Sequence, residues 1–328
     1  MRVLVTGGAG FVGSHVLDRL QACGHEPRNF DLLASPYHCN GNSVDTAIGD
    51  LRDEAAVRAA IRGCDAVLHL AAVADVNQVV QDPVRAEDVN VRGTRILLDA
   101  ARAEGIGHFV YASTVWVYGN AVDANAVTED TPLSLPTHLY TATKLAGEMY
   151  TKSYGELYGL PHTILRFGIP YGPRARAAAV LAAFVARAQA GEPISIAGDG
   201  AQTRQFVYVE DLAHGVLASL VPQAVGRTYN LVRDESVSVR QIADIVRELV
   251  ADVPVVHGPA RAADVKLARV SGERAATELG WSPGTPFAEG ARRYVESLSG
   301  TSGSPSAWAA SIIAGSAPTV LRQDPGAL

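Results

Sequence analysis

Short apolar runs alternate with longer helical patterns through the first half of the chain, and this rhythm limits the possible folds most strongly. The apolar runs lie at residues 2–6, 44–49, 65–70 and 108–113, and the helical patterns at 11–23, 53–61, 83–104 and 137–158. Such repeats are typical of βαβ units, which build a parallel sheet covered by helices on both faces. The sequence therefore predicts an α/β fold with a doubly wound parallel sheet, whose ligands bind beyond the carboxyl ends of the strands.

The second half of the chain is less regular. Helical patterns near residues 177–190 and 238–250 flank a turn at 198–200. A length of 328 residues allows about two domains. We expect a sheet domain over 1–168 that also includes roughly residues 203–235. A smaller α/β lobe is expected over 169–202 and 236–298, followed by a tail rich in Gly, Ser and Ala over 299–328.

Composition excludes several classes of protein. The formal net charge of −6 leaves no basic stripe, so we expect no nucleic-acid partner and no binding to an anionic membrane surface. No apolar run approaches the roughly 18 residues of a membrane helix, which predicts a cytoplasmic protein without a signal peptide. Cys23, Cys39 and Cys64 are too few and too widely spaced for a disulfide framework or a metal site, and no metal is predicted.

A glycine loop follows the first apolar run. Gly7, Gly10 and Gly13 have the spacing of a loop that approaches a pyrophosphate, and Phe11 and Val12 open the helix whose N-terminal amides would face the phosphates. The simpler alternative is an ordinary tight turn between a strand and a helix. Because the loop lies between an expected strand and an expected helix, it predicts a dinucleotide site.

Asp31 lies 18 residues after Gly13, at the end of the expected second strand. A carboxylate there accepts hydrogen bonds from the adenosine ribose and repels a 2′-phosphate, which favours NAD over NADP. Leu32 and Leu33 follow without an arginine, and Arg28 precedes the aspartate.

Tyr140 and Lys144 begin the helical pattern at 137–158, and their spacing of four places both on one face of a helix. A lysine ammonium, together with an oxidised nicotinamide, would lower the pKa of the phenol toward the working range of a base. An isolated pair of this kind is more often an interfacial tyrosine and a solvated lysine. The glycine loop upstream favours the catalytic interpretation.

Taken together, the motifs resemble those of the extended short-chain dehydrogenase/reductase superfamily, the branch of the nucleotide-sugar epimerases and dehydratases. The resemblance covers about residues 1–298. Besides the glycine loop and the Tyr140–Lys144 pair, the motifs are Gly49-Asp50-Leu51, His69-Leu70-Ala71-Ala72, Asn90, Ser113-Thr114 with Tyr118-Gly119, Leu165-Arg166 with Tyr171-Gly172-Pro173, and Gly198-Asp199-Gly200 with Arg204 and residues 206–211.

The resemblance implies roles for single residues. Asp50 and Leu51 would flank the adenine, Leu70, Ala71 and Ala72 would line the pyrophosphate and the nicotinamide ribose, and Asn90 and Lys144 would also bind the cofactor. Thr114 would be the catalytic hydroxyl that bonds the substrate oxygen beside Tyr140. The alternative for Thr114 is a helix or turn cap.

Two residues after Thr114 bear on the reaction. Dehydratases of this branch carry an Asp-Glu pair there, and decarboxylases carry a Glu, whereas this chain has Val115 and Trp116. The remaining chemistry needs only Thr114, Tyr140, Lys144 and NAD. It predicts a UDP-hexose 4-epimerase. In this reaction hydride passes to NAD, the flat 4-keto sugar rotates, and hydride returns to its other face. A 4-ketosugar reductase, or a non-catalytic nicotinamide-binding regulatory protein, is the alternative.

The expected substrate residues agree with the family only in part. Arg204 and Arg261 are similar to its diphosphate ligands, and Asn77 is a candidate for contacting the sugar. Ile169 replaces the usual Asn and Gln205 the usual Asp, so the base and the sugar stay open. Family members are often homodimers, which here would pair through the helices at 83–104 and 137–158.

Overall fold

The computed structural model describes residues 1–38, 43–119, 126–259 and 269–299. Its main body is a seven-stranded sheet in the order β11-β6-β5-β4-β1-β2-β3, and every neighbouring pair of strands is parallel. The strands are β1 (Arg2–Thr6), β2 (Glu26–Asp31), β3 (Asp45–Ile48), β4 (Ala66–His69), β5 (His108–Thr114), β6 (His162–Phe167) and β11 (Arg227–Leu231). The predicted α/β fold, a Rossmann-type parallel sheet, is confirmed.

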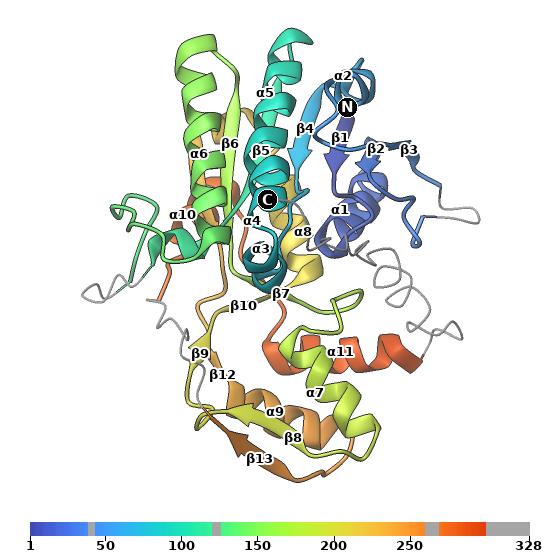
Figure 1. Cartoon of the computed structure of the whole chain (residues 1–328), viewed down its shortest axis with the longest axis vertical. Coiled ribbons are helices and arrows are strands. Elements are labelled where there is room, and N and C mark those ends of the chain that lie inside the picture. The colour runs from blue at the N-terminus through green and yellow to red at the C-terminus, as the bar shows by residue number, and fades with distance from the viewer. Residues whose placement is uncertain (39–42, 120–125, 260–268, 300–328) are drawn as a thin grey trace, which may run out of the picture.

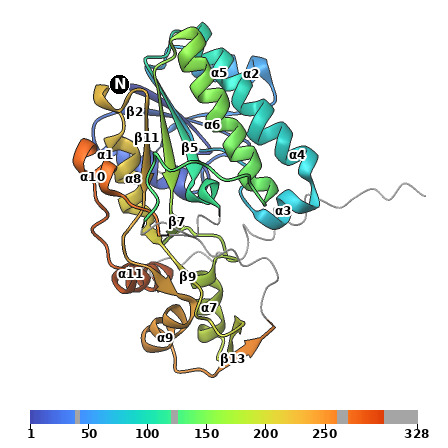
Figure 2. The same ribbon diagram turned by 90° about the vertical axis from the view of Figure 1, so that its left-hand side faces the viewer.

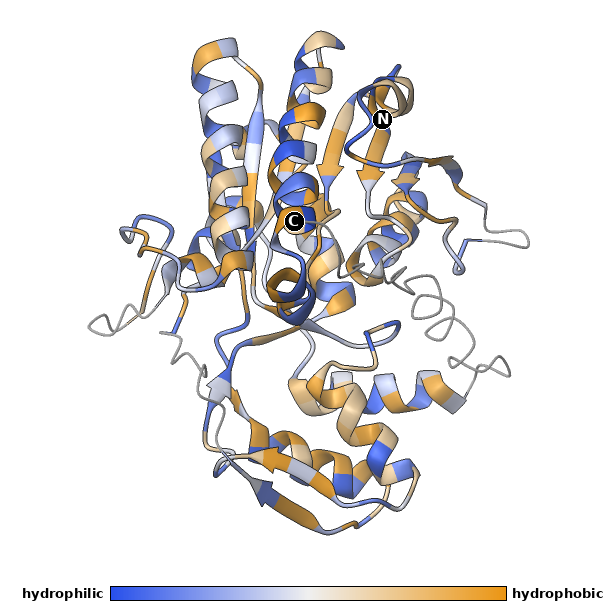
Figure 3. Cartoon of the chain, viewed as in Figure 1, coloured by the Kyte–Doolittle hydropathy of each residue, from blue (hydrophilic) through white to orange (hydrophobic). Residues whose placement is uncertain are grey.

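Helices cover both faces of this sheet because successive strand side chains point to opposite faces. In β1, Val3 and Val5 pack in one core with residues of α1 (Phe11–Ala22) and α8 (Val209–Ala218). Leu4 packs in the other, with residues of α2 (Glu54–Ile61) and α5 (Gly93–Ala103), and α6 (Leu139–Tyr158) lies on the same face (Figure 2). The middle residues of β1, Val3–Val5, and the first three of β4, Ala66–Leu68, are apolar (Figure 3).

The helix expected over residues 83–104 is interrupted. After α3 (Val76–Gln81), the chain forms α4 (Pro83–Glu87), a π-helical segment η1 (Asp88–Arg92) and then α5. A π turn holds one more residue than an α turn and is often found at functional sites. Here it contains Asn90, whose side chain is buried and hydrogen-bonded to the loop after β4. Apolar periodicity alone does not reveal this insertion.

The smaller lobe is built from helices α7 (Val180–Gln189), α9 (Val239–Leu249) and α11 (Phe287–Ser299), which share one apolar core. Its short strands pair as β7 (Ile169–Tyr171) with β10 (Phe206–Tyr208), β8 (Ile194–Ala197) with β13 (Val255–Gly258), and β9 (Thr203–Arg204) with β12 (Val237–Ser238). The remaining helices are η2 (Val115–Tyr118), η3 (Pro222–Ala224) and α10 (Glu273–Leu279).

The lobe lies beyond the carboxyl ends of the strands of the main sheet (Figure 1). Side chains that follow β1, β2, β4 and β5 therefore emerge on the side of the sheet that faces the lobe. The predicted domain limits stay a prediction. Cys23 is an exposed free thiol and Cys64 a buried one, while Cys39 and residues 300–328 lie outside the described residues. Within the described ranges, no helix has both the length and the apolar character needed to span a bilayer.

Candidate active site

The glycine loop between β1 and α1 leaves no room for side chains. Gly7 has a φ of 76°, and a Cβ there would lie 2.8 Å from backbone atoms of Ala71. A Cβ on Gly13 would lie 2.1 Å from the carbonyl oxygen of Gly7. Gly10 precedes α1, and no side chain of the described residues caps the first turn at Phe11 and Val12. The amides at this helix N-terminus thus have the chemistry to bind an anion such as a pyrophosphate.

Asp31 ends β2 beside this loop. Its Oδ2 accepts a hydrogen bond from the Ala9 N–H at 3.0 Å, and burial raises its pKa while backbone N–H groups lower it. Arg28 donates to Asp45 at 2.7 Å and to the carbonyl of Ala60 at 3.0 Å. Arg28, the arginine that precedes Asp31 in the sequence, is therefore engaged with β3 and α2.

The other expected cofactor residues lie near the same sheet edge. Asp50 accepts from Arg52 at 2.7 Å, which lowers the pKa of the Asp50 carboxyl. Leu51 is buried in the core under α2 and α5. Leu70, Ala71 and Ala72 follow β4 and are partly exposed, as a residue that touches a ligand must be before the ligand binds.

A directed chain of hydrogen bonds holds Ala71. The Thr94 hydroxyl donates to the carbonyl of Asn90 at 2.6 Å, so it accepts from Nε2 of His69 at 2.8 Å. Nδ1 of His69 then accepts from Thr6 Oγ1 at 2.7 Å, and Thr6 Oγ1 accepts from the Ala71 N–H at 3.2 Å. Burial, followed by the charge of a nearby lysine, lowers the pKa of His69 to about 3. The imidazole is neutral and fixes the turn after β4.

Asn90 joins that turn to helix α6. Its Oδ1 accepts from the Val73 N–H at 2.7 Å, and its Nδ2 donates to the Val73 carbonyl and to Thr143 Oγ1, both at 3.0 Å. Thr143 Oγ1 donates to the Tyr140 carbonyl at 2.8 Å. Both amide hydrogens of Asn90 are thereby used within the protein. The structure gives Asn90 a positioning role, and its expected contact with the cofactor stays a prediction.

Lys144 and Tyr140 lie one turn apart on α6. The Lys144 Nζ donates to the Ala112 carbonyl at 2.9 Å, and burial lowers the pKa of this lysine to about 8, opposed by Glu148. Burial raises the pKa of Tyr140 to about 12, opposed by the charge of Arg176. In the chain itself desolvation dominates, because it disfavours the phenolate. The lowering expected from Lys144 together with an oxidised nicotinamide stays a prediction.

Thr114 is the last residue of β5 rather than the first residue after it. Its Oγ1 accepts from the Trp116 N–H at 3.3 Å, so it caps η2. The cap considered from the sequence is present, and the Thr114 hydroxyl hydrogen stays available to a substrate oxygen.

The segment η2 contains one titratable side chain, that of Tyr118. The Tyr118 hydroxyl donates to Asn230 Oδ1 at 2.7 Å and accepts from Arg166 Nη1 at 2.8 Å. Burial raises its pKa. Tyr118 is thus a structural residue, held between β6 and β11.

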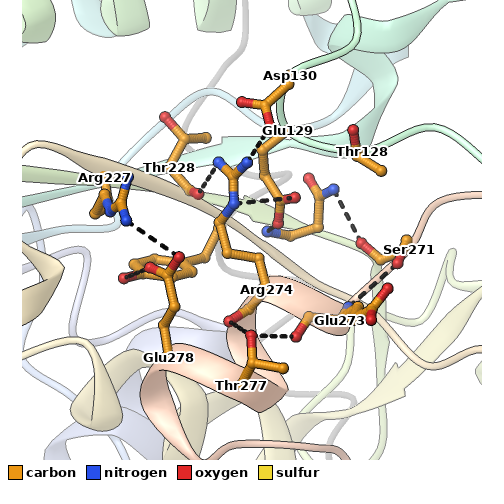
Figure 4. Close-up of polar contacts among 12 residues, drawn as sticks. Thr128, Glu129, Asp130, Arg227, Thr228, Ser271, Glu273, Arg274, Thr277 and Glu278 are labelled. Carbon is orange, nitrogen blue, oxygen red and sulfur yellow. Dashed lines mark hydrogen bonds and ion pairs between the residues drawn. The ribbon is translucent and has the colours of Figure 1, made fainter.

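Asn230 is in turn held by a charged cluster beside β11 (Figure 4). The Asn230 N–H donates to Glu129 Oε1 at 2.7 Å, and its Nδ2 donates to the Ser271 carbonyl at 3.1 Å. Arg274 lies 3.7 Å from Glu129 and also bonds Asp130. The residues of this cluster are far apart in the sequence. The cluster positions Asn230, which in turn holds the Tyr118 hydroxyl at the end of η2.

The expected substrate residues are less closely grouped. Asn77 is exposed on α3 rather than in a loop, and its backbone N–H donates to Asp75. Arg204 lies on β9 and lines a cavity that Val115 and Ile169 also line. Arg261 lies outside the described residues.

Sequence reasoning missed Arg176, which follows β7. Its Nη1 donates to Asp75 Oδ2 at 3.0 Å, so it connects the lobe to the loop before α3. Its charge also acts on the pKa of Tyr140. No spacing in the sequence relates Arg176 to either residue, since the contact depends on how the lobe meets the sheet.

Comparison with known proteins identifies the family. The profile of the NAD dependent epimerase/dehydratase family matches residues 3–231. The chain belongs to this family. A UDP-glucose 4-epimerase of Mycolicibacterium smegmatis is 35% identical over 309 residues, which cover 90% of this chain and 98% of that protein.

Solved structures of the family share the fold. The UDP-glucose 4-epimerase of Thermotoga maritima, solved with UDP-glucose, is 31% identical with a TM-score of 0.86, and the match covers 91% of this chain and 99% of that one. The Thermus thermophilus UDP-glucose 4-epimerase, solved with NAD, is 35% identical with a TM-score of 0.84, over 92% and 100%. This protein is thus an NAD-dependent enzyme of the extended short-chain dehydrogenase/reductase type. The glycine loop at Gly7, Gly10 and Gly13 and the carboxylate of Asp31 fit that cofactor.

Proposed function

We propose that the enzyme is a cytoplasmic nucleotide-sugar 4-epimerase of the UDP-hexose type, which inverts C4 through a transient 4-keto sugar. The observation that supports this reaction is the chemistry of η2. Val115 and Trp116 offer no carboxylate beside Thr114, and the Tyr118 hydroxyl is engaged by Arg166 and Asn230. Elimination of water needs a further acid and base, whereas epimerisation does not.

Each proposed catalytic residue has one task. Tyr140 takes the proton from the C4 hydroxyl and later returns it, and Thr114 donates a hydrogen bond to the same oxygen. Lys144 has three N–H donors, of which one bonds the Ala112 carbonyl, so two stay available to a ribose. When bound, NAD supplies the hydride acceptor and donor and, in its oxidised form, a positive charge near the phenol.

Two groups of residues would hold the cofactor. The loop at Gly7, Gly10 and Gly13 would take the pyrophosphate on the N-terminus of α1. Asp31 would bind the adenosine ribose, with Asp50, Leu51 and residues 70–72 around it. This arrangement follows the sheet edge at which β1, β2 and β4 end.

We also propose a homodimer formed through α4–α5 and α6. Helix α6 exposes Met149, Tyr150, Leu157 and Tyr158, and Val84 of α4 is exposed as well. Apolar side chains gathered on neighbouring helices are typical of a protein interface. Light scattering of the purified enzyme measures its mass directly, and a monomer at micromolar concentration would contradict the proposal.

A turnover panel tests the reaction. The enzyme is purified without added cofactor, its released ligands are analysed by mass spectrometry, and it is incubated with UDP-glucose, UDP-galactose and their N-acetyl and uronate relatives. We expect retained NAD and C4 inversion seen by proton NMR. In D₂O no deuterium should enter C4, because the returning hydride comes from the bound cofactor. Absence of C4 inversion with every sugar, or turnover that consumes added NADH or NADPH, would overturn the proposal.

A further inference from the structure

The strand order of the main sheet reverses between β1 and β4. After β1 the chain builds β2 and β3 on one side, and then β4, β5 and β6 on the other. Ligands of open parallel sheets bind at such a switch point, beyond the carboxyl ends of the strands. The segments on its two sides are α1, which follows β1, and the loop before α3, which follows β4. A segment of the lobe that contacts both of them therefore crosses the switch point.

Residues 173–176, called the strap below, make both contacts. They follow β7, where the lobe meets the main sheet (Figure 1). On the side of α1, His15 Nε2 donates to the Pro173 carbonyl at 3.0 Å, and Arg174 Nη1 donates to Asp18 Oδ2 at 2.7 Å. On the side of β4, Arg176 bonds Asp75 at 3.0 Å. The strap is thus fastened on both sides of the switch point.

The carboxylate of Asp18 also holds the loop that follows Asp31. Its Oδ1 accepts from Nε2 of His38 at 3.0 Å, and the Arg174 guanidinium lies 4.5 Å from the centre of the Tyr37 ring. Burial raises the pKa of Asp18, but the bonds from His38 and Arg174 outweigh burial and lower that pKa, so the carboxylate is charged. One ion pair therefore joins the strap, α1 and the loop beside the expected adenosine ribose.

The backbone of Arg174 is strained. Its φ is 67°, and no other residue besides glycine has a positive φ in the described part of the chain. Such a conformation costs free energy and persists only where surrounding contacts compensate for it. The bond to Asp18 and the contact with the Tyr37 ring supply this compensation. The strap is thus kept in place by its side chains rather than by the preference of its backbone.

A dinucleotide bound at the switch point could leave past the lobe only if the strap moved. We infer that Arg174 and Arg176 are positioning residues, which hold the strap across bound NAD and slow the release of the cofactor. An epimerase needs such retention, because the hydride that leaves the sugar must return from the same NAD molecule. The inference rests on the proposed function, which places the cofactor at this sheet edge.

The test measures the exchange of bound NAD. Holoenzyme is mixed with an excess of isotopically labelled NAD, and the mass of the bound cofactor is followed over time after gel filtration. Partly exposed ion pairs each contribute little, so Arg174→Gln and Arg176→Gln should each speed exchange roughly threefold, and the double variant roughly tenfold. Turnover is a poorer measure, because the charge of Arg176 also acts on the pKa of Tyr140.

Two further measurements separate the effect of charge from a general loosening of the fold. Salt screens exposed charges, so exchange in the unaltered enzyme should quicken as sodium chloride is added, and exchange in the double variant should respond much less. Arg174→Lys keeps the positive charge and should exchange NAD more slowly than Arg174→Gln.

Arg227→Gln is the matched control. Arg227 is 53% exposed, close to the 56% of Arg176, and pairs with Glu278 at 3.2 Å, but it lies at the amino end of β11, away from the switch point. We expect unchanged exchange in this variant, and equal acceleration there would overturn the inference. Equal melting temperatures exclude a folding defect. If Arg174→Gln melts lower than the unaltered enzyme, the more exposed Arg176→Gln decides the test alone.

The outcomes separate the two proposals. If the double variant exchanges NAD within twofold of the unaltered enzyme, the inference is wrong even when C4 inversion is observed. If exchange is faster but no sugar is inverted at C4, the proposed reaction is wrong and the role of the strap stands. If the unaltered enzyme neither retains NAD nor takes up the labelled form, both are overturned.

Discussion

The Arg166 guanidinium donates to both carboxylate oxygens of Glu148, at 3.0 Å to Oε1 and 2.7 Å to Oε2, and the two side chains are 2% and 1% exposed. Ser113, the neighbour of Thr114, donates to Glu148 Oε1 at 2.5 Å. Arg166 also donates to Tyr118. The pair therefore connects α6, which carries Tyr140 and Lys144, to the strand end and to η2.

Glu148→Ala is expected to destabilise the fold strongly. Removing one partner leaves a buried guanidinium without its counter-charge, which costs about 3–5 kcal/mol. Urea unfolding of the purified variant measures the loss. Glu156→Ala, an exposed glutamate on the same helix, should change stability by less than about 0.5 kcal/mol. Equal losses in the two variants would show that the buried pair contributes nothing.

Tyr140→Phe is expected to lower the rate of C4 inversion by about 10²–10⁴-fold, because the ring stays and only the proton acceptor is lost. NAD content should be unchanged. Steady-state rates and the released cofactor are measured together. Tyr229→Phe, which loses a hydroxyl bonded to Glu278 at 2.8 Å and lies away from the proposed reaction centre, serves as the control and should retain full activity. A Tyr140→Phe enzyme with more than a tenth of the normal rate would remove Tyr140 from the mechanism.

Gly13→Ala is expected to disrupt the glycine loop, because the new Cβ would lie 2.1 Å from the Gly7 carbonyl oxygen. The loop must shift, and NAD affinity should fall by roughly tenfold or more. Gly284→Ala adds a Cβ with no heavy atom within 4 Å of it and should behave like the unaltered protein. Cofactor retained after gel filtration distinguishes the two variants, and equal retention would contradict the expectation.

Asp31→Asn is expected to reduce the preference for NAD over NADP by roughly tenfold, because the negative charge that repels a 2′-phosphate is removed. The amide oxygen can still accept from the Ala9 N–H, so the loop should keep its shape. Competition between the two dinucleotides, read by mass spectrometry of the bound fraction, measures the preference. An unchanged ratio would mean that another group selects the cofactor.

Acid should destabilise the protein partly through His69. Burial holds the pKa of the folded imidazole at about 3, against about 6.5 in the unfolded chain. Between these values only the unfolded chain takes up the proton, so stability falls as the pH falls below 6.5. The contribution is about 1.4 kcal/mol per pH unit.

The slope of unfolding free energy with pH tests this assignment. Urea titrations at several pH values below 6.5 should show a shallower slope for His69→Gln than for the unaltered protein. His257→Gln, which changes an exposed imidazole, should keep the original slope. If His69→Gln keeps it too, another group causes the acid sensitivity.

Local sequence was enough to predict the elements that carry the cofactor. The first strand was predicted at its observed bounds, and Asp31 ends β2 as expected, because a buried parallel strand, a glycine turn and a helix are all encoded by neighbouring residues. The expected catalytic residues, Thr114, Tyr140 and Lys144, also come from short motifs. Their roles stay a prediction until the variants are measured.

What the sequence did not reveal depends on contacts between distant residues. The π turn at Asn90 follows from bonds to Val73, and the raised pKa of Tyr140 follows from desolvation that only packing creates. Arg176 reaches Asp75 across the junction of sheet and lobe. Neither periodicity nor spacing contains such information.

Gln205 illustrates what a neutral side chain makes possible. Its carboxamide offers one acceptor and one donor group to Val270, so it acts as an additional residue of a β-ladder. A carboxylate at this position would face the Arg233 and Val270 carbonyl oxygens without a proton to donate. Its negative charge would also partly neutralise Arg204 and Arg269, which line the same cavity as Gln205. The amide does neither at any physiological pH. Gln205 thereby fixes one wall of this cavity and adds no charge to it.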